Sequence, residues 1–320
     1  MSTAAAPQPS TARTLLHDTF HRSRLAIGDP VLDQALDGLD VAGGLTEIAG
    51  EAGTGKTQLA LQLMLQAQLP SQRFGGLGGG ALYLHGDTSN VDPALKRLHT
   101  IASAFATRHA ALGADVERLK AQIYVLQIDS PDDLWHVVDE RLPTFLNEQA
   151  VRLIVVDSLA GMYRGLADVP AGGARYNAPA NPHAAQAELA KERAKLVQKL
   201  AARLKQISSA FNVAVVVTNQ VADKPFDEAQ RRAAAPWERS SDVCGLPDGG
   251  GARVPALGPS WASCVNSRIV LTRRDAAGGA SDGACAHHWT RQLHVAWSPR
   301  LGECSLDFAL ADHGLVGLAH

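Results

Sequence analysis

The glycine-rich segment GEAGTGKT at residues 50–57 constrains the fold more than any other feature of this sequence. It continues the apolar run LTEIAG, which predicts a buried strand, and opens the helical run QLALQLMLQAQLP, which ends at Pro70. Glycines in such a turn let successive backbone N–H groups point at a phosphate, and the helix N-terminus adds a favourable potential. The alternative is a chance glycine-rich turn, which the flanking strand and helix disfavour. The segment therefore predicts a phosphate-binding loop.

The loop matches the pattern GxxxxGK[ST] over its whole length. Lys56 is expected to reach the β- and γ-phosphates of a nucleotide, and the Thr57 hydroxyl is expected to bind Mg²⁺. The other loop residues are expected to hold the nucleotide with them: Gly50, Glu51, Ala52, Gly53, Thr54 and Gly55.

Asp157 stands at the end of VRLIVVD, the clearest buried strand in the sequence. A carboxylate at the carboxyl end of such a strand can hold Mg²⁺ and its water shell beside a phosphate loop. The alternative is an aspartate that caps the next turn. We expect Asp157 and Thr57 to form the metal side of the site.

Two further polar residues end predicted strands. Asp87 follows ALYLHG, where some P-loop ATPases place the carboxylate that polarises the attacking water, so Asp87 is a candidate general base. A simple turn residue explains Asp87 equally well. Gln220 ends VAVVVTNQ, where an amide can sense the γ-phosphate and signal to the following loop. Lys56, Asp87 and Gln220 are therefore the candidate catalytic residues.

The order of predicted elements indicates an α/β fold. Apolar strands at 45–50, 81–86, 122–128, 151–157 and 213–220 alternate with helical segments, among them a long amphipathic helix at 184–210. This alternation predicts a mostly parallel, twisted sheet with helices on both faces. The last strand-like pieces, SRIVLTR, RQLHVAWS and CSLDFAL, predict antiparallel hairpin strands that extend the sheet. Residues 165–182 and 222–258 are rich in glycine, proline and alanine and predict irregular loops.

The charge balance excludes a protein that holds DNA or an anionic membrane by overall charge. The chain has 30 basic and 32 acidic residues and a formal net charge of −2. The predicted loop at 222–258 contains five basic and six acidic residues, so it is not a basic patch. Arg231, Arg232 and Trp237 could contact phosphates and stack on bases, but composition favours a solvated charged loop.

Composition also bounds the domain organisation. We expect a flexible tail at 1–23 followed by one ATPase-sized domain at 24–320; the tail's Ala, Ser and Arg content leaves an organellar transit peptide as an alternative. The four cysteines show no paired or zinc-ligand spacing, which favours a reducing compartment. No run of 18 apolar residues is present, so no membrane partner is expected.

Four segments together resemble the RecA-type recombinases: LTEIAGEAGTGKTQLALQLMLQAQLP, ALYLHGD, LIVVDSLAGMYR and VAVVVTNQV. Their order and spacing are similar to those of the eukaryotic strand-exchange recombinase and its paralogues. Three segments resemble one paralogue group in particular: KTQLALQLMLQAQLP, PALGPSWASCVNSR and QLHVAWSPRLGECSLDFAL. The resemblance covers about residues 24–318.

The resemblance implies a RecA-like P-loop ATPase core that acts in homologous recombination and double-strand break repair, with ATP and Mg²⁺ as cofactors. Gln58 extends the nucleotide loop, Arg97 resembles an arginine that packs on the adenine, and Gln220 matches a γ-phosphate sensor. Residues 165–183 and 222–258 occupy the positions of the two DNA-binding loops. The arginines implied to face DNA are Arg164, Arg231, Arg232, Arg239 and Arg253.

This sequence departs from the family in two ways. The family usually has glutamate at the position of Asp87, and an aspartate is one methylene shorter, so hydrolysis is expected to be slow. The family also carries a small helical DNA-binding domain before the core, where this chain has about two dozen residues, and no Phe-x-x-Ala polymerisation tag precedes the core.

Two functional hypotheses follow. The first is a weak, DNA-stimulated ATPase within a complex of recombinase paralogues, which contacts single-stranded or branched DNA and the strand-exchange recombinase. The second is an interaction subunit in which ATP stabilises an interface with negligible hydrolysis. The resemblance implies a nuclear protein, and cytoplasmic or organellar locations stay open.

Overall fold

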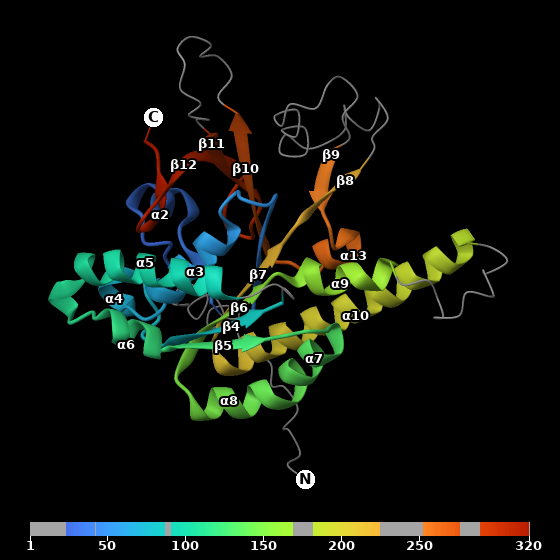
Figure 1. The fold of residues 1–320 in the computed structure, drawn as a ribbon, viewed down its shortest axis with the longest axis horizontal. Helices are drawn as coiled ribbons and strands as arrows, with labels where there is room; N and C mark the ends of the chain where they lie inside the picture. The colour runs from blue at the N-terminus through green and yellow to red at the C-terminus, as the bar shows by residue number, and fades with distance from the viewer. Residues whose placement is uncertain are drawn as a thin grey trace, which may run out of the picture.

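The computed structural model describes residues 24–41, 43–86, 91–168, 182–224, 252–275 and 289–319 (Figure 1). The predicted tail at 1–23, Asp87, Arg231, Arg232 and Arg239 lie outside these ranges. Within them, no helix is both long enough and apolar enough to span a bilayer.

A nine-stranded sheet forms the centre of the structure, in the order β13-β12-β11-β10-β3-β7-β6-β4-β5. Its strands are β3 (Leu45–Gly50), β4 (Gly80–His85), β5 (Ile123–Gln127), β6 (Val151–Asp157), β7 (Ala214–Asn219), β10 (Ser267–Asp275), β11 (Trp289–Trp297), β12 (Cys304–Ala311) and β13 (Gly314–Gly317). From β5 to β10 neighbouring strands run parallel, and from β10 to β13 they run antiparallel. The predicted mixed sheet is confirmed; the short GLVG strand β13 was not expected.

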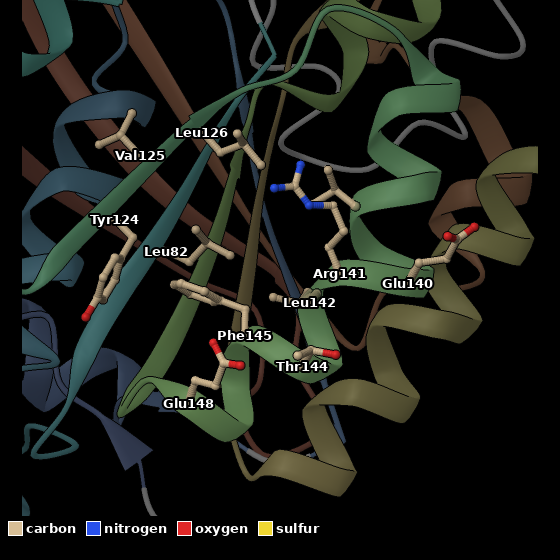
Figure 2. Close-up of a pocket in the computed structure, with 11 residues that line it drawn as sticks. Leu82, Tyr124, Val125, Leu126, Glu140, Arg141, Leu142, Thr144, Phe145 and Glu148 are labelled. Carbon is tan, nitrogen blue, oxygen red and sulfur yellow. The ribbon is translucent and has the colours of Figure 1, made fainter.

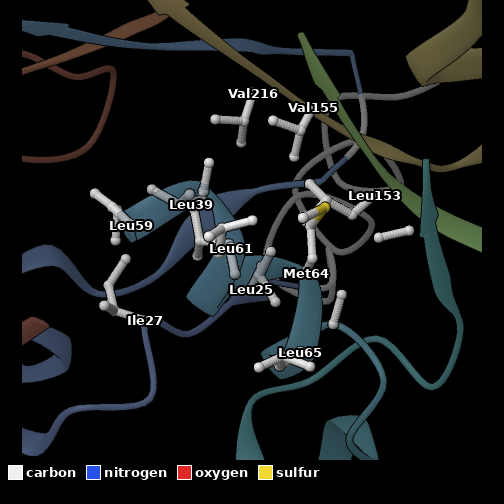
Figure 3. Packing of buried hydrophobic residues seen from close by; sticks show 14 of the residues in the cluster. Leu25, Ile27, Leu39, Leu59, Leu61, Met64, Leu65, Leu153, Val155 and Val216 are labelled. Carbon is white, nitrogen blue, oxygen red and sulfur yellow. The ribbon is translucent and has the colours of Figure 1, made fainter. Parts of the chain in front are cut away.

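One face of the sheet packs on the helix that follows the phosphate loop. Helix α3 (Lys56–Gln66) is buried almost all round, because the sheet lies on one side and β13 and α5 (Asp92–Arg108) pack against it as well. Leu25, Ile27 and Leu39 from the N-terminal strands β1 (Arg24–Leu25) and β2 (Leu39–Asp40) and their connection enter this core (Figure 3). Three shorter helices complete this face: α2 (Pro30–Leu36), α4 (Ser71–Phe74) and α6 (Val116–Ala121).

A second set of helices covers the opposite face (Figure 1). It comprises α7 (Pro131–His136), the π-helical turn η2 (Val137–Arg141), α8 (Leu142–Glu148), α9 (Leu159–Asp168), α10 (Pro182–Phe211) and α13 (Gly258–Ala262). In α10, Val197, Leu200, Leu204 and Ile207 point at the sheet, which confirms the predicted amphipathic helix. Leu196, on the same helix, is 39% exposed.

The two predicted irregular segments are partly regular. Helix α9 runs to Asp168 and α10 already starts at Pro182, so the first loop is shorter than the composition suggests. In the second segment, β8 (Val221–Lys224) and β9 (Ala252–Pro255) form an antiparallel ribbon and α13 follows. Glycine and proline content marked these segments as irregular, but pairing with a distant strand supplied the backbone hydrogen bonds.

Candidate functional site

The sequence-predicted residues meet at one edge of the sheet. Strands β3, β7, β6 and β4 are parallel neighbours, so their carboxyl ends lie together. The phosphate loop follows β3, Gln220 follows β7 and Asp157 ends β6. In open α/β sheets this edge is the usual place for a ligand.

The glycines give the loop a shape that other residues would not allow. Gly53 and Gly55 have φ angles of 77° and 113°, in the region that favours glycine. A Cβ on Gly50 would lie 2.4 Å from the Leu271 carbonyl oxygen, so β10 leaves no room for a side chain there. The Thr54 hydroxyl closes the turn by donating to the Glu51 carbonyl over 2.9 Å. The loop is therefore preshaped before any ligand binds.

Lys56 is the basic group of the loop. It is 8% exposed, and its Nζ donates to the Glu51 carbonyl oxygen over 2.7 Å. Burial lowers its pKa from the usual 10.5 to about 8, although Asp157 and Glu51 act in the opposite direction. A buried ammonium that lacks full compensation would be stabilised by an anion at the loop.

Thr57 and Asp157 are joined by a direct hydrogen bond. The Thr57 hydroxyl donates to Asp157 Oδ2 over 2.8 Å, across a separation of 100 residues. The Tyr83 hydroxyl donates to the same oxygen over 2.8 Å, and the Thr218 hydroxyl donates to Oδ1. The peptide bond between Asp157 and Ser158 is cis. Three hydroxyls thus fix a carboxylate that is only 6% exposed.

Sequence reasoning missed Tyr83 and Thr218. Both lie inside apolar strands, on β4 and β7, the two neighbours of β6. The sequence offered only a weak indication of their role. A hydroxyl in an otherwise apolar strand needs a buried hydrogen-bond partner, but the sequence does not show which residue that partner is.

The structure places Arg97 beside Gln58, at the end of the phosphate loop. Its Nε donates to Gln58 Oε1 over 2.6 Å, and its Nη2 donates to the Ala311 carbonyl oxygen. Asp312 lies 3.8 Å from its Nη1. The guanidinium therefore borders the start of α3 and the turn between β12 and β13.

Gln220 lies just beyond β7, and its carbonyl oxygen accepts a hydrogen bond from the Ala256 N–H over 2.8 Å. This bond ties the candidate sensor to the chain that follows β9. Arg164 lies in α9 and Arg253 lies in β9, and the structure describes their backbone only. The DNA contacts expected of them remain predictions.

The donor set suits a nucleotide with Mg²⁺. Gly50 has no room for a side chain, Gly53 and Gly55 adopt positive φ angles, and Lys56 carries a charge that burial disfavours. The Thr57 hydroxyl and the Asp157 carboxylate are hard oxygen ligands, which Mg²⁺ prefers together with phosphate oxygens. Among the described residues, no group of three or more His, Cys, Asp or Glu side chains is placed to hold a metal ion.

Comparisons with known proteins agree with this geometry. A model of the Rad51 family matches residues 22–239. The DNA repair protein XRCC3 homolog of Arabidopsis thaliana is 32% identical over 317 residues, which are 95% of this chain and 96% of the relative. The DNA repair protein XRCC3 of Mus musculus is 31% identical over 302 residues, 92% of this chain and 75% of the relative. The DNA repair protein rhp57 of Schizosaccharomyces pombe is 26% identical over 304 residues, 91% of this chain and 78% of the relative.

These matches confirm the resemblance that the motifs suggested, including the finer one to a single paralogue group. The family model covers more than half of the chain, and two relatives exceed 30% identity over nearly all of it. The α/β sheet with its phosphate loop and antiparallel C-terminal strands is a RecA-like core. The chain therefore belongs to the Rad51 family and is a RecA-type paralogue that resembles XRCC3 in particular.

Proposed function

We propose that this protein binds ATP with Mg²⁺ and acts in homologous recombination and DNA repair as one subunit of a recombinase-paralogue complex. The observation that carries the proposal is the hydrogen bond between Thr57 and Asp157, at 2.8 Å. It brings a helix-start hydroxyl and a strand-end carboxylate together beside the phosphate loop. The names of the relatives support the repair context.

Each residue of the site has a role in this proposal. Lys56 and the loop N–H groups would hold the phosphate oxygens. Thr57 and Asp157 would hold Mg²⁺, which supplies charge neutralisation for those oxygens when it is bound. Tyr83 and Thr218 keep the Asp157 carboxylate oriented. Arg97 and Gln58 lie where they could border the base.

Gln220 would sense the phosphate and alter the chain after β9. Its carbonyl already holds the Ala256 N–H, so a displacement of Gln220 would reach the ribbon β8-β9. This ribbon belongs to the second predicted DNA-contacting loop, at 222–258. Nucleotide binding would thereby change contacts with DNA or with a neighbouring subunit.

Turnover separates an ATPase from an interaction subunit. We expect the purified protein to hydrolyse ATP slowly and single-stranded DNA to stimulate this hydrolysis. Asp87→Glu should raise the turnover number, because the longer side chain reaches the attacking water better. Steady-state phosphate release measures this, with Ser89→Thr, which also adds one carbon and lies two residues along the chain, as the control. Tight nucleotide binding without DNA-stimulated turnover would contradict the ATPase hypothesis and favour the interaction subunit. No gain in Asp87→Glu would mean that Asp87 is not the water-positioning carboxylate.

A groove beside the edge strand β5 supports the second hypothesis (Figure 2). It has a volume of about 670 Å³, and Leu82, Leu126, Leu142 and Phe145 form its apolar wall between the sheet and α8. Glu140, Arg141, Thr144 and Glu148 also line it. Among the described strands β5 pairs only with β4, so its outer edge is open to an extended segment.

We assign this groove to an extended segment of another Rad51-family subunit, with a large apolar side chain inserted between β5 and α8. Such a segment would gain backbone hydrogen bonds from the edge and burial from the pocket. Val125, in the middle of β5, is 40% exposed and would be covered.

A charge at the edge should abolish this contact. We expect Val125→Lys to weaken binding of a purified Rad51-family partner at least about tenfold, because edge lysines oppose strand addition. Sedimentation velocity or calorimetry with the partner measures the loss. Leu112→Lys is the matched control, since Leu112 is 38% exposed and lies away from the groove lining. Equal affinity of the two variants would show that the partner binds elsewhere.

A further inference from the structure

A buried polar network lies inside the protein, on the sheet face opposite α3. At its centre is the carboxylate of Glu47 on β3, which is 0% exposed. Asn219 Nδ2 and Trp261 Nε1 donate to Glu47 Oε1 over 2.6 Å and 2.9 Å. Arg268 Nε forms an ion pair with Oε2, and the guanidinium lies 4.0 Å from the centre of the Trp297 ring. The nucleotide site described above uses none of these groups.

Two of the partners flank the segment 225–251. Asn219 is the last residue of β7 and directly precedes Gln220. Trp261 lies in α13, which begins three residues after β9 ends. The β8-β9 ribbon pairs the residues on either side of 225–251, and Asn219, before the ribbon, and Trp261, after it, both donate to Glu47.

A substitution that removes a single bond of this network is expected to destabilise the protein. Breaking any of its bonds would leave a buried donor or a buried charge without compensation, which costs more than a surface contact. Glu47 itself pairs with Arg268 and lies only three residues before Gly50, where the phosphate loop starts. Asn219 and Trp261 donate to the same oxygen, Glu47 Oε1, so a displacement at the end of β7 acts on the oxygen that also holds Trp261.

We propose that Glu47 is a positioning residue that couples the Gln220 end of β7 to α13, so that the nucleotide state is passed to the β8-β9 ribbon. The coupling rests on the proposed nucleotide function. It acts through the two hydrogen bonds at Glu47 Oε1, whereas the Arg268 pair compensates the charge of the buried carboxylate.

Two variants separate coupling from stability. Trp261→Phe removes the indole N–H but keeps an aromatic ring, and Trp135→Phe in α7 is the matched control. Glu47→Gln keeps an oxygen that accepts from Asn219 and Trp261 but leaves Arg268 without its counter-charge. Amide hydrogen exchange of residues 221–224 and 252–257 is measured with and without a non-hydrolysable ATP analogue and Mg²⁺. Nucleotide affinity and thermal unfolding are measured in parallel.

In the wild type and in Trp135→Phe we expect the nucleotide to slow exchange of these amides. In Trp261→Phe we expect similar nucleotide affinity but about half of that response or less. Glu47→Gln should melt at a lower temperature and yet keep the response, which a purely structural role would not produce. A full response in Trp261→Phe, or a lost response in Glu47→Gln alone, would overturn the coupling. An unchanged exchange in wild type that binds the nucleotide would also overturn it, whereas absence of nucleotide binding would refute the proposed function itself.

Discussion

Replacement of Lys56 by alanine is expected to weaken ATP binding by about 100-fold while the protein stays folded. In the proposed site the Lys56 ammonium would supply charge-assisted hydrogen bonds to phosphate, each worth about 1.5–3 kcal/mol. In the free protein the same ammonium is 8% exposed and its pKa is lowered to about 8, so its charge is disfavoured there. Fluorescent-nucleotide titration measures the affinity, and circular dichroism confirms the fold. Lys120→Ala, at an exposed pair with Glu117, is the matched control.

The same substitution should remove a pH dependence of stability. The pKa of Lys56 is about 8 in the folded protein and 10.5 normally, so between these values the unfolded chain binds more protons. Burial of the charged ammonium therefore lowers the free energy of unfolding below about pH 8, and this loss disappears as the pH rises towards 10.5. In thermal melts the wild type should gain stability between pH ~7 and pH ~9.5, and Lys56→Ala should lack this gain. Unchanged ATP affinity in Lys56→Ala would refute the assignment of the phosphate site.

Replacement of Arg268 by methionine is expected to lower the free energy of unfolding by about 3–5 kcal/mol. Arg268 is 4% exposed and is the counter-charge of Glu47, so its loss leaves a carboxylate buried without a cation. It also removes the contact with the Trp297 ring. Urea unfolding followed by circular dichroism measures the change. Lys120→Met breaks an exposed pair and should cost less than about 1 kcal/mol.

A double variant tests the cause. Glu47→Gln combined with Arg268→Met removes both charges and keeps an acceptor for Asn219 and Trp261. We expect it to be more stable than either single variant, because no unpaired charge is buried. If the two losses simply add, the cost arises from packing and the ion pair is not its origin.

The elements that could be predicted are those marked by a pattern within one short stretch of sequence. Strands β3, β6 and β7 are recognisable because both of their faces are buried, which produces continuous apolar runs. Lys56 and Thr57 are recognisable because the phosphate loop is one short segment. Asp157 could be named because a polar residue ends an apolar strand.

The unpredicted part depends on distant pairing. Helix α9 was missed because its first turn follows the strand directly and its glycine content suggests a loop. The β8-β9 ribbon was missed because each of its strands is four residues long and gains its hydrogen bonds only from the other. The groove beside β5 forms where α8 packs across two strands, so no single stretch of sequence predicts it.

The sequence by itself determined the phosphate loop, the order of strands and helices, and the membership of a recombinase family, since each of these is written in contiguous residues. The tertiary structure alone decided which side chains meet: Tyr83 and Thr218 at Asp157, and Trp261 at Glu47, 214 residues away. The physical reason is that a buried polar group must find a partner, but sheet order and register choose that partner. The net charge of −2 therefore leaves the specificity of this protein to a few placed groups and to its partners.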